Sequence, residues 1–170
     1  MRLLKDSRTL NLLISVIIIS SFSYLTFERN KVWQDPVSLW TDVITKAPEN
    51  ARAYNNLGRA YGSQRRHLDA SAEFKKALEI LPNYALAHLN LAVSYSNLGM
   101  PAQAEFHYRK AIEYYPDLAA AYYNYGLFLY VNGRLDEAEK AFVKYTEFSP
   151  NGSFASAVNR MLGSIRARKG

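Results

Sequence analysis

The sequence contains no cysteine, which excludes a disulfide framework, a thiol nucleophile and a thiolate metal site. It also lacks an internal surplus of positive charge, although its formal net charge is +6. The surplus lies in the first eight and the last eleven residues, whereas residues 9–159 carry 14 basic and 14 acidic side chains. Because no basic stripe is left to follow a phosphate backbone, we expect no nucleic-acid partner.

Motifs that carry catalysis are missing as well. The histidines, His67, His88 and His107, lack the spacing of metal ligands, and the chain has no Gly-rich phosphate loop, nucleophile elbow or His-Glu-x-x-His motif. The sequence therefore predicts a protein that is not an enzyme and that binds neither a metal nor a cofactor. Its composition, 49% hydrophobic and 14% aromatic, is nevertheless sufficient for a packed core.

One long uncharged run is present near the N-terminus, from Thr9 to Phe27. As a helix, these 19 residues would extend roughly 28 Å, close to the hydrocarbon thickness of a bilayer. The run predicts a transmembrane anchor; the alternative is a cleaved signal peptide, because Ser21-Phe22-Ser23 offers a small-x-small cleavage site. Basic residues are denser before the run, in the flank 1–8, than after it, which favours a cytoplasmic N-terminus and an extracytoplasmic remainder, periplasmic in a bacterium.

Prolines recur every 34 residues, at positions 48, 82, 116 and 150. This period divides the chain into three units, 51–84, 85–118 and 119–152, each with two helical apolar patterns separated by a turn. The turns contain the glycine, asparagine and proline residues that end helices. Small residues at equivalent places, such as Gly58, Ala92 and Gly126, would let the two helices of each unit approach closely.

The residues that repeat with this period resemble the tetratricopeptide repeat (TPR) family. The first unit carries the family pattern as Tyr54, Leu57, Gly58, Tyr61, Ala70, Phe74, Ala77 and Pro82; the second as His88, Leu91, Ala92, Tyr95, Ala104, Tyr108, Ala111 and Pro116; the third as Tyr122, Tyr125, Gly126, Leu129, Ala138, Phe142, Tyr145 and Pro150. The resemblance implies an all-α fold, a right-handed helical solenoid of three full repeats, with no strand.

Both flanks of the three units depart from the pattern. In the segment 28–50, Asp35 followed by Pro36 predicts a helix near 36–47, the second half of an incomplete repeat. In the segment 153–170, apolar residues on one helical face predict a capping helix near 154–167, followed by a basic tail. Tyr145, at a place where the family has a small residue, is expected to meet this non-standard neighbour.

Three asparagines, Asn56, Asn90 and Asn124, occupy position 6 of their repeats. Family geometry implies that they line the concave side, and the repeats are similar to those of O-linked N-acetylglucosamine transferases, in which such asparagines hold an extended peptide by its backbone. An amide suits this role because it offers both a donor and an acceptor to a peptide unit. The alternatives are a hydrated groove without a ligand and bonds to the local backbone. If the asparagines are outside the core, changing all three to Ala should leave stability nearly unchanged.

The remaining predicted groove residues follow from the same resemblance. They are Arg52, Asn55 and Arg59 in the first unit, Leu86, Leu89 and Val93 in the second, and Tyr123, Leu127 and Tyr130 in the third. The predicted function is a single-pass membrane scaffold that binds a protein or extended peptide. Two alternatives stay open: an accessory region of a membrane glycosyltransferase, because residues 24–61 resemble a junction in bacterial relatives of transmembrane-and-TPR O-mannosyltransferases, and an envelope-assembly factor that forms a homo-oligomer.

Overall fold

The computed structural model describes residues 7–169, and within this range the chain is helical throughout, with turns between the helices and no strand. The helices in this range are α1 (Ser7–Gln34), α2 (Pro36–Lys46), α3 (Ala51–Ser63), α4 (His67–Ile80), α5 (Ala85–Asn97), α6 (Pro101–Tyr114), α7 (Ala119–Val131), α8 (Leu135–Phe148) and α9 (Ala155–Lys169). The all-α prediction is confirmed.

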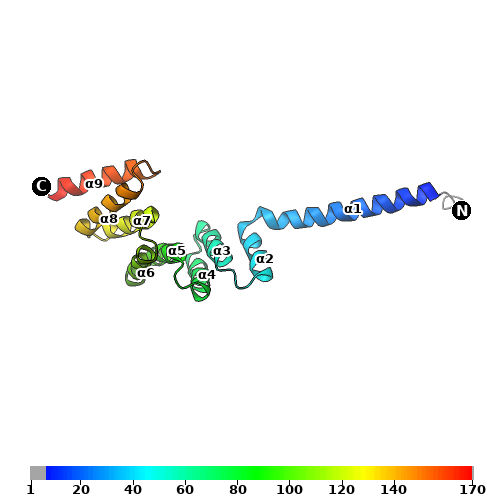
Figure 1. Ribbon diagram of the computed structural model, residues 1–170, viewed down its shortest axis with the longest axis horizontal. Helices are drawn as coiled ribbons and strands as arrows, with labels where there is room; N and C mark the ends of the chain where they lie inside the picture. Colours follow the sequence, from blue (N-terminus) through cyan, green and yellow to red (C-terminus); the bar gives the residue numbers. More distant parts are fainter. Residues whose placement is uncertain (1–6, 170) are drawn as a thin grey trace.

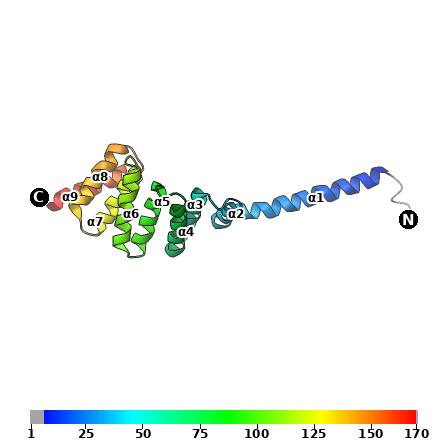
Figure 2. The ribbon, with the colours of Figure 1, turned by 60° about the horizontal axis from the view of Figure 1, so that its bottom comes forward.

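Helices α3 to α8 form three hairpins, α3–α4, α5–α6 and α7–α8, which correspond to the three 34-residue units (Figure 1). Each hairpin packs against the next, so the hairpins follow one another in a row rather than surround one centre (Figure 2). The first helices of the hairpins, α3, α5 and α7, adjoin one another and form one wall of the solenoid. Such a stack shares its core between neighbouring repeats.

Small residues at the helix crossings explain why each hairpin closes so tightly. Ala70, Ala104 and Ala138, at equivalent places, have no exposed surface. A Cβ atom added to Gly58 would lie 2.5 Å from Cε1 of the Phe74 ring, so that position has no room for a methyl group. The small and aromatic residues that repeat in the sequence are thus the residues that pack between the two helices of each hairpin.

The two ends of the solenoid agree with the sequence. At the N-terminal end, the Asp35 carboxylate accepts a hydrogen bond from the Ser38 backbone N–H at 2.9 Å, and α2 begins at Pro36 and packs on α3. At the C-terminal end, Val158 and Ile165 of α9 are fully buried. The Tyr145 hydroxyl accepts a hydrogen bond from the backbone N–H of Phe154 at 3.1 Å, as expected of a last repeat that meets a non-standard neighbour.

Helix α1 is longer than the uncharged run that predicts it. It extends to Gln34 and projects away from the solenoid (Figure 1). Its segment Thr9–Asn30 has a mean hydropathy of 1.9, is not buried against the rest of the chain, and is long and apolar enough to cross a membrane. The side chains of the basic flank 1–8 lie outside the described residues.

Candidate functional site

Two hollows lie one repeat apart on the wall formed by α3, α5 and α7. The first, of about 190 Å³, is lined by Arg59, Gly62, His67, Phe74, Asn90, Val93 and Ser94. The second, of about 210 Å³, is lined by Val93, Ser96, Asn97, Tyr108, Asn124, Leu127, Phe128, Val131 and Asn132. Val93 borders both hollows, and we call the two hollows together the groove.

The three predicted asparagines are half-buried, and two of them line the groove. The amide nitrogen of Asn90 donates to the side-chain oxygen of Asn55, in the preceding repeat, at 2.9 Å. The amide nitrogen of Asn124 instead donates to the backbone carbonyl of Ala120, in its own helix, at 2.7 Å. The difference has a simple cause: Leu89 occupies the place equivalent to Asn55 and offers no acceptor.

Replacing Asn90 by alanine is therefore expected to destabilise the fold, which corrects the expectation that all three asparagines can be removed without cost. The change leaves the Asn55 oxygen, in a side chain only 3% exposed, without its donor, a loss of about 1–3 kcal/mol in the free energy of unfolding. Asn124→Ala is the matched control and should change it by less than about 0.5 kcal/mol, because only a bond within its own helix is lost. Urea denaturation measures both; equal losses would contradict the assignment.

The other predicted groove residues divide into accessible and buried ones. Arg59 and Leu127 line the groove, whereas Arg52 is exposed but lines neither hollow. Asn55 and Leu89 are 3% and 5% exposed, so the prediction that position 5 faces a ligand is wrong for both. At this position the side chain turns toward the neighbouring helices and joins the contact between repeats.

The C-terminal segment occupies the far end of this wall. The ring of Tyr123 stacks against that of Phe154, with centroids 4.1 Å apart and planes 9° from parallel. The guanidinium of Arg168 lies 6.0 Å from the ring centroid of Tyr130. Both tyrosines were predicted to contact a ligand, but the structure gives them partners from the capping segment, and neither of them lines the groove.

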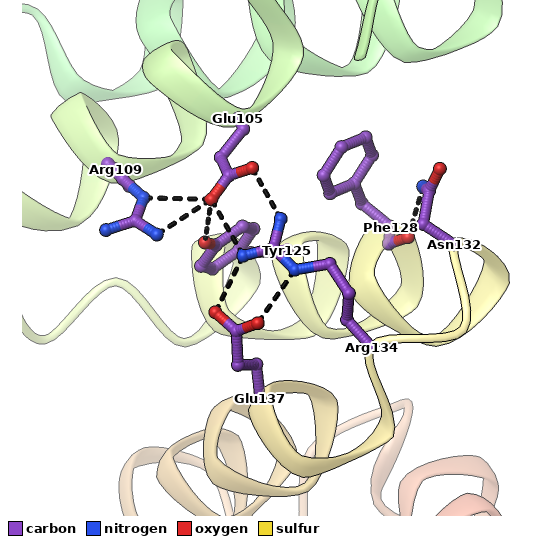
Figure 3. Close-up of polar contacts among 7 residues, drawn as sticks. All are labelled: Glu105, Arg109, Tyr125, Phe128, Asn132, Arg134 and Glu137. Atoms are coloured by element: carbon purple, nitrogen blue, oxygen red, sulfur yellow. Dashed lines mark hydrogen bonds and ion pairs between the residues drawn. The ribbon is translucent and has the colours of Figure 1, made fainter. Parts of the chain in front are cut away.

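An ion-pair network between the second and third repeats has no counterpart in the sequence pattern (Figure 3). Arg134, in the turn before α8, donates to Glu105 of α6 at 3.0 Å and to Glu137 of α8 at 2.7 Å. Arg109 and the hydroxyl of Tyr125 also donate to Glu105, at 2.7 and 3.1 Å. These donors, the Arg134 guanidinium above all, lower the pKa of Glu105 to about 2.

A second contact missed by the sequence joins two histidines of the middle repeat. Nδ1 of His88 lies 2.8 Å from Nδ1 of His107, and Nε2 of His88 lies 2.9 Å from the Pro82 carbonyl oxygen. Because a carbonyl only accepts, His88 carries its proton on Nε2 and accepts from His107 at Nδ1. Burial lowers the pKa of both rings, and with the added effects of His88 and Lys75 it lowers that of His107 to about 4.

This pair predicts a loss of stability in mild acid. The unfolded histidines titrate near pH 6.5 and the folded ones lower, so between about pH 7 and pH 4 the unfolded state binds more protons, and stability falls as the pH falls. We expect the free energy of unfolding to drop by on the order of 2 kcal/mol over this range. Denaturation measured at a series of pH values should show this fall in the free energy of unfolding for the native chain and a smaller fall for His107→Gln. Glu105→Gln should retain it, because the Glu105 carboxylate loses its stabilising effect below about pH 4.5.

Comparison with known proteins gives two matches to tetratricopeptide repeat profiles, over residues 51–84 and 89–153. No curated protein sequence matches the chain. Among solved structures, the crystal structure of MamA is 24% identical, with a TM-score of 0.69, and the alignment covers 79% of this chain and 77% of MamA. PilF of Pseudomonas aeruginosa is 32% identical over 70% of this chain and 53% of its own, with a TM-score of 0.65.

A third similar structure is the first TPR domain of RPAP3 bound to the HSP90 peptide SRMEEVD. It is 24% identical, with a TM-score of 0.64, and the alignment covers 69% of this chain and 91% of that domain. The two profile matches together span most of residues 51–153, the same region in which the structure shows three stacked hairpins. The chain therefore belongs to the tetratricopeptide repeat family.

Proposed function

We propose that this chain is a membrane-anchored scaffold that holds an extended segment of a partner protein in the groove. The observation that carries this proposal is the repetition of the groove itself: two hollows of nearly equal volume, one repeat apart, each with an asparagine amide at the same place. A ligand with a repeating backbone suits a site with a repeating amide.

The polar and apolar groups of the groove indicate what such a segment would contact. Asn124 uses one amide N–H on its own helix, and its second N–H and its oxygen are the groups that a peptide unit would pair with. Val93 and Leu127 provide apolar surface beside the amides, and Arg59 provides a positive charge at the N-terminal end. The RPAP3 domain, which is similar in fold, is bound to an HSP90 peptide, which supports a peptide as the ligand class.

The anchor supports the same proposal from the other end of the chain. Segment Thr9–Asn30 finds no core within the described residues to bury it, and a bilayer would provide one. In the proposed state, α1 crosses the membrane and the repeats lie on its extracytoplasmic side, which is the periplasm in a bacterium. The scaffold would then recruit its partner to the membrane surface.

Site-specific photo-crosslinking in membranes tests this function. We expect a crosslinker placed at Val93 or Leu127 to capture a partner, and one placed at Leu68, which is 70% exposed on α4, to capture none. Asn124→Ala should weaken the captured partner's binding by about 1 kcal/mol for the lost backbone contact, whereas Asn83→Ala, in an exposed turn, should not. Equal capture at all three crosslinking positions, or none at the groove, would contradict the proposal.

A further inference from the structure

A larger cleft lies between α6, α7 and α8, apart from the groove and sharing none of its lining residues. Its volume is about 510 Å³, within the range of pockets that hold small ligands. The apolar lining consists of Ile112, Tyr122, Tyr125, Leu129 and Ala141. The charged residues of the lining are Arg109, Glu113, Glu137, Lys140 and Lys144.

Tyr125 explains why the cleft exists at this junction of repeats. The equivalent positions in the first two repeats hold Leu57 and Leu91, and there α4 and α5 pack more closely than α6 and α7 do. The larger Tyr125 ring stacks on Tyr108, with centroids 5.6 Å apart, and its hydroxyl donates to Glu105 (Figure 3). The wall of the cleft is therefore held by ring packing and by the Glu105 network, which makes the cleft a preformed feature.

The charges around the cleft are compensated with one exception. Arg109 pairs with Glu105, Glu113 with Lys110, Glu137 with Arg134, and Lys144 with Glu147. Lys140 has no ion-pair partner within the part of the chain that the structure describes. An apolar cleft bordered by one uncompensated ammonium matches a ligand with an apolar body and a single carboxylate.

We propose that this cleft binds the carboxyl-terminal residue of a partner polypeptide, with a large apolar side chain against Tyr122 and Ile112 and the terminal carboxylate at Lys140. A single carboxylate pairs with Lys140, whereas an acidic segment would find no second unpaired cation in the lining, because Arg109 and Lys144 already pair with Glu105 and Glu147. The volume leaves room for one large side chain together with its terminal carboxylate. This second site stands independently of the groove, because the two share no lining residue.

The test uses the full chain in detergent micelles and the pentapeptide GSGSW as the probe, with its C-terminus either free or amidated. We expect weak binding, with a Kd on the order of 1 mM, and the free acid should bind about two- to fivefold more tightly than the amide. Lys140→Gln should abolish this preference, while Arg160→Gln, an equal loss of charge on α9, should retain it. NMR methyl signals of Ile112 should shift on titration, and those of Val93 in the groove should not.

Several outcomes would overturn the proposal. Equal affinity of acid and amide for the native chain, or a preference that survives Lys140→Gln, would show that Lys140 does not bind the carboxylate. Shifts at Val93 instead of Ile112 would place the probe in the groove, and the absence of any shift at several millimolar peptide would show that the cleft does not bind it. Tighter binding of free N-acetyltryptophan than of the pentapeptide would assign the cleft to small aromatic acids rather than to a polypeptide.

Discussion

Replacing Phe142 by alanine is expected to lower the free energy of unfolding by about 3–5 kcal/mol. The ring is fully buried in the last hairpin, where it lies against Gly126. Its removal leaves a cavity that neighbours from two repeats cannot fill, because each is already held in the shared core. Urea denaturation followed by circular dichroism measures the loss. Phe106→Ala is the control: this ring is 55% exposed, and its loss should cost less than about 1 kcal/mol.

A double-mutant cycle tests whether the cause is the contact itself. A Cβ on Gly126 would lie 2.7 Å from Cδ1 and Cε1 of the Phe142 ring, so Gly126→Ala alone should destabilise the native chain by about 1–3 kcal/mol. In the Phe142→Ala background the same change should cost almost nothing, because the space is then open. Additive losses would show that Gly126 is required for another reason, such as local backbone geometry.

Removing residues 1–34 is expected to transfer the chain almost completely from membranes to the aqueous phase. The apolar residues of Thr9–Asn30 contribute on the order of 4 kcal/mol to insertion, roughly a thousandfold in partition. Flotation with liposomes should recover the full chain with the vesicles and a chain beginning at Asp35 in the soluble fraction. The shorter chain should retain its helical spectrum, because α2 to α9 contain the shared core.

A point substitution distinguishes insertion into the bilayer from nonspecific adsorption to the vesicles. Ile18→Lys places a charge near the middle of the segment and should weaken insertion by about 2.5–3.5 kcal/mol. Leu68→Lys, at a residue 70% exposed on α4, should leave flotation unchanged. Mass spectrometry of the protein from cells adds a separate criterion: a mature chain that begins near residue 24 would show a cleaved signal peptide and contradict the anchor.

The fold could be predicted because the residues that form its helix contacts repeat periodically along the sequence. Alanine, glycine and aromatic residues recur at the same places in each 34-residue unit, and each place corresponds to one kind of contact in the hairpin. The extent of α1 could not be predicted from hydropathy, because the polar residues 28–31 end the apolar run. The helix continues through them since no glycine or proline interrupts it before Pro36, which disfavours helical geometry at Asp35.

The candidate site was predictable only in part. The register of the repeat placed Asn90, Asn124 and Val93 on one wall, but it did not separate them from the buried Asn55 and Leu89, because adjacent helical positions differ by only about 100° in direction. The bond between Asn90 and Asn55 depends on which side chain the previous repeat provides. The pair of Glu105 and Arg134, 29 residues apart, depends on side-chain reach across two repeats, which no local pattern encodes.

Helix α1 is continuous from the proposed membrane segment to Gln34, and in the proposed state it would fix the rotational orientation of the repeats about the helix axis. A flexible tether would let the repeats rotate freely, whereas a continuous helix transmits its rotational phase to whatever follows it. Each residue inserted between residues 28 and 34 would turn the groove by about 100° around the helix axis and raise it by only about 1.5 Å. If α1 crosses a membrane as proposed, the number of residues in this short segment would determine the direction in which the groove faces along the membrane plane.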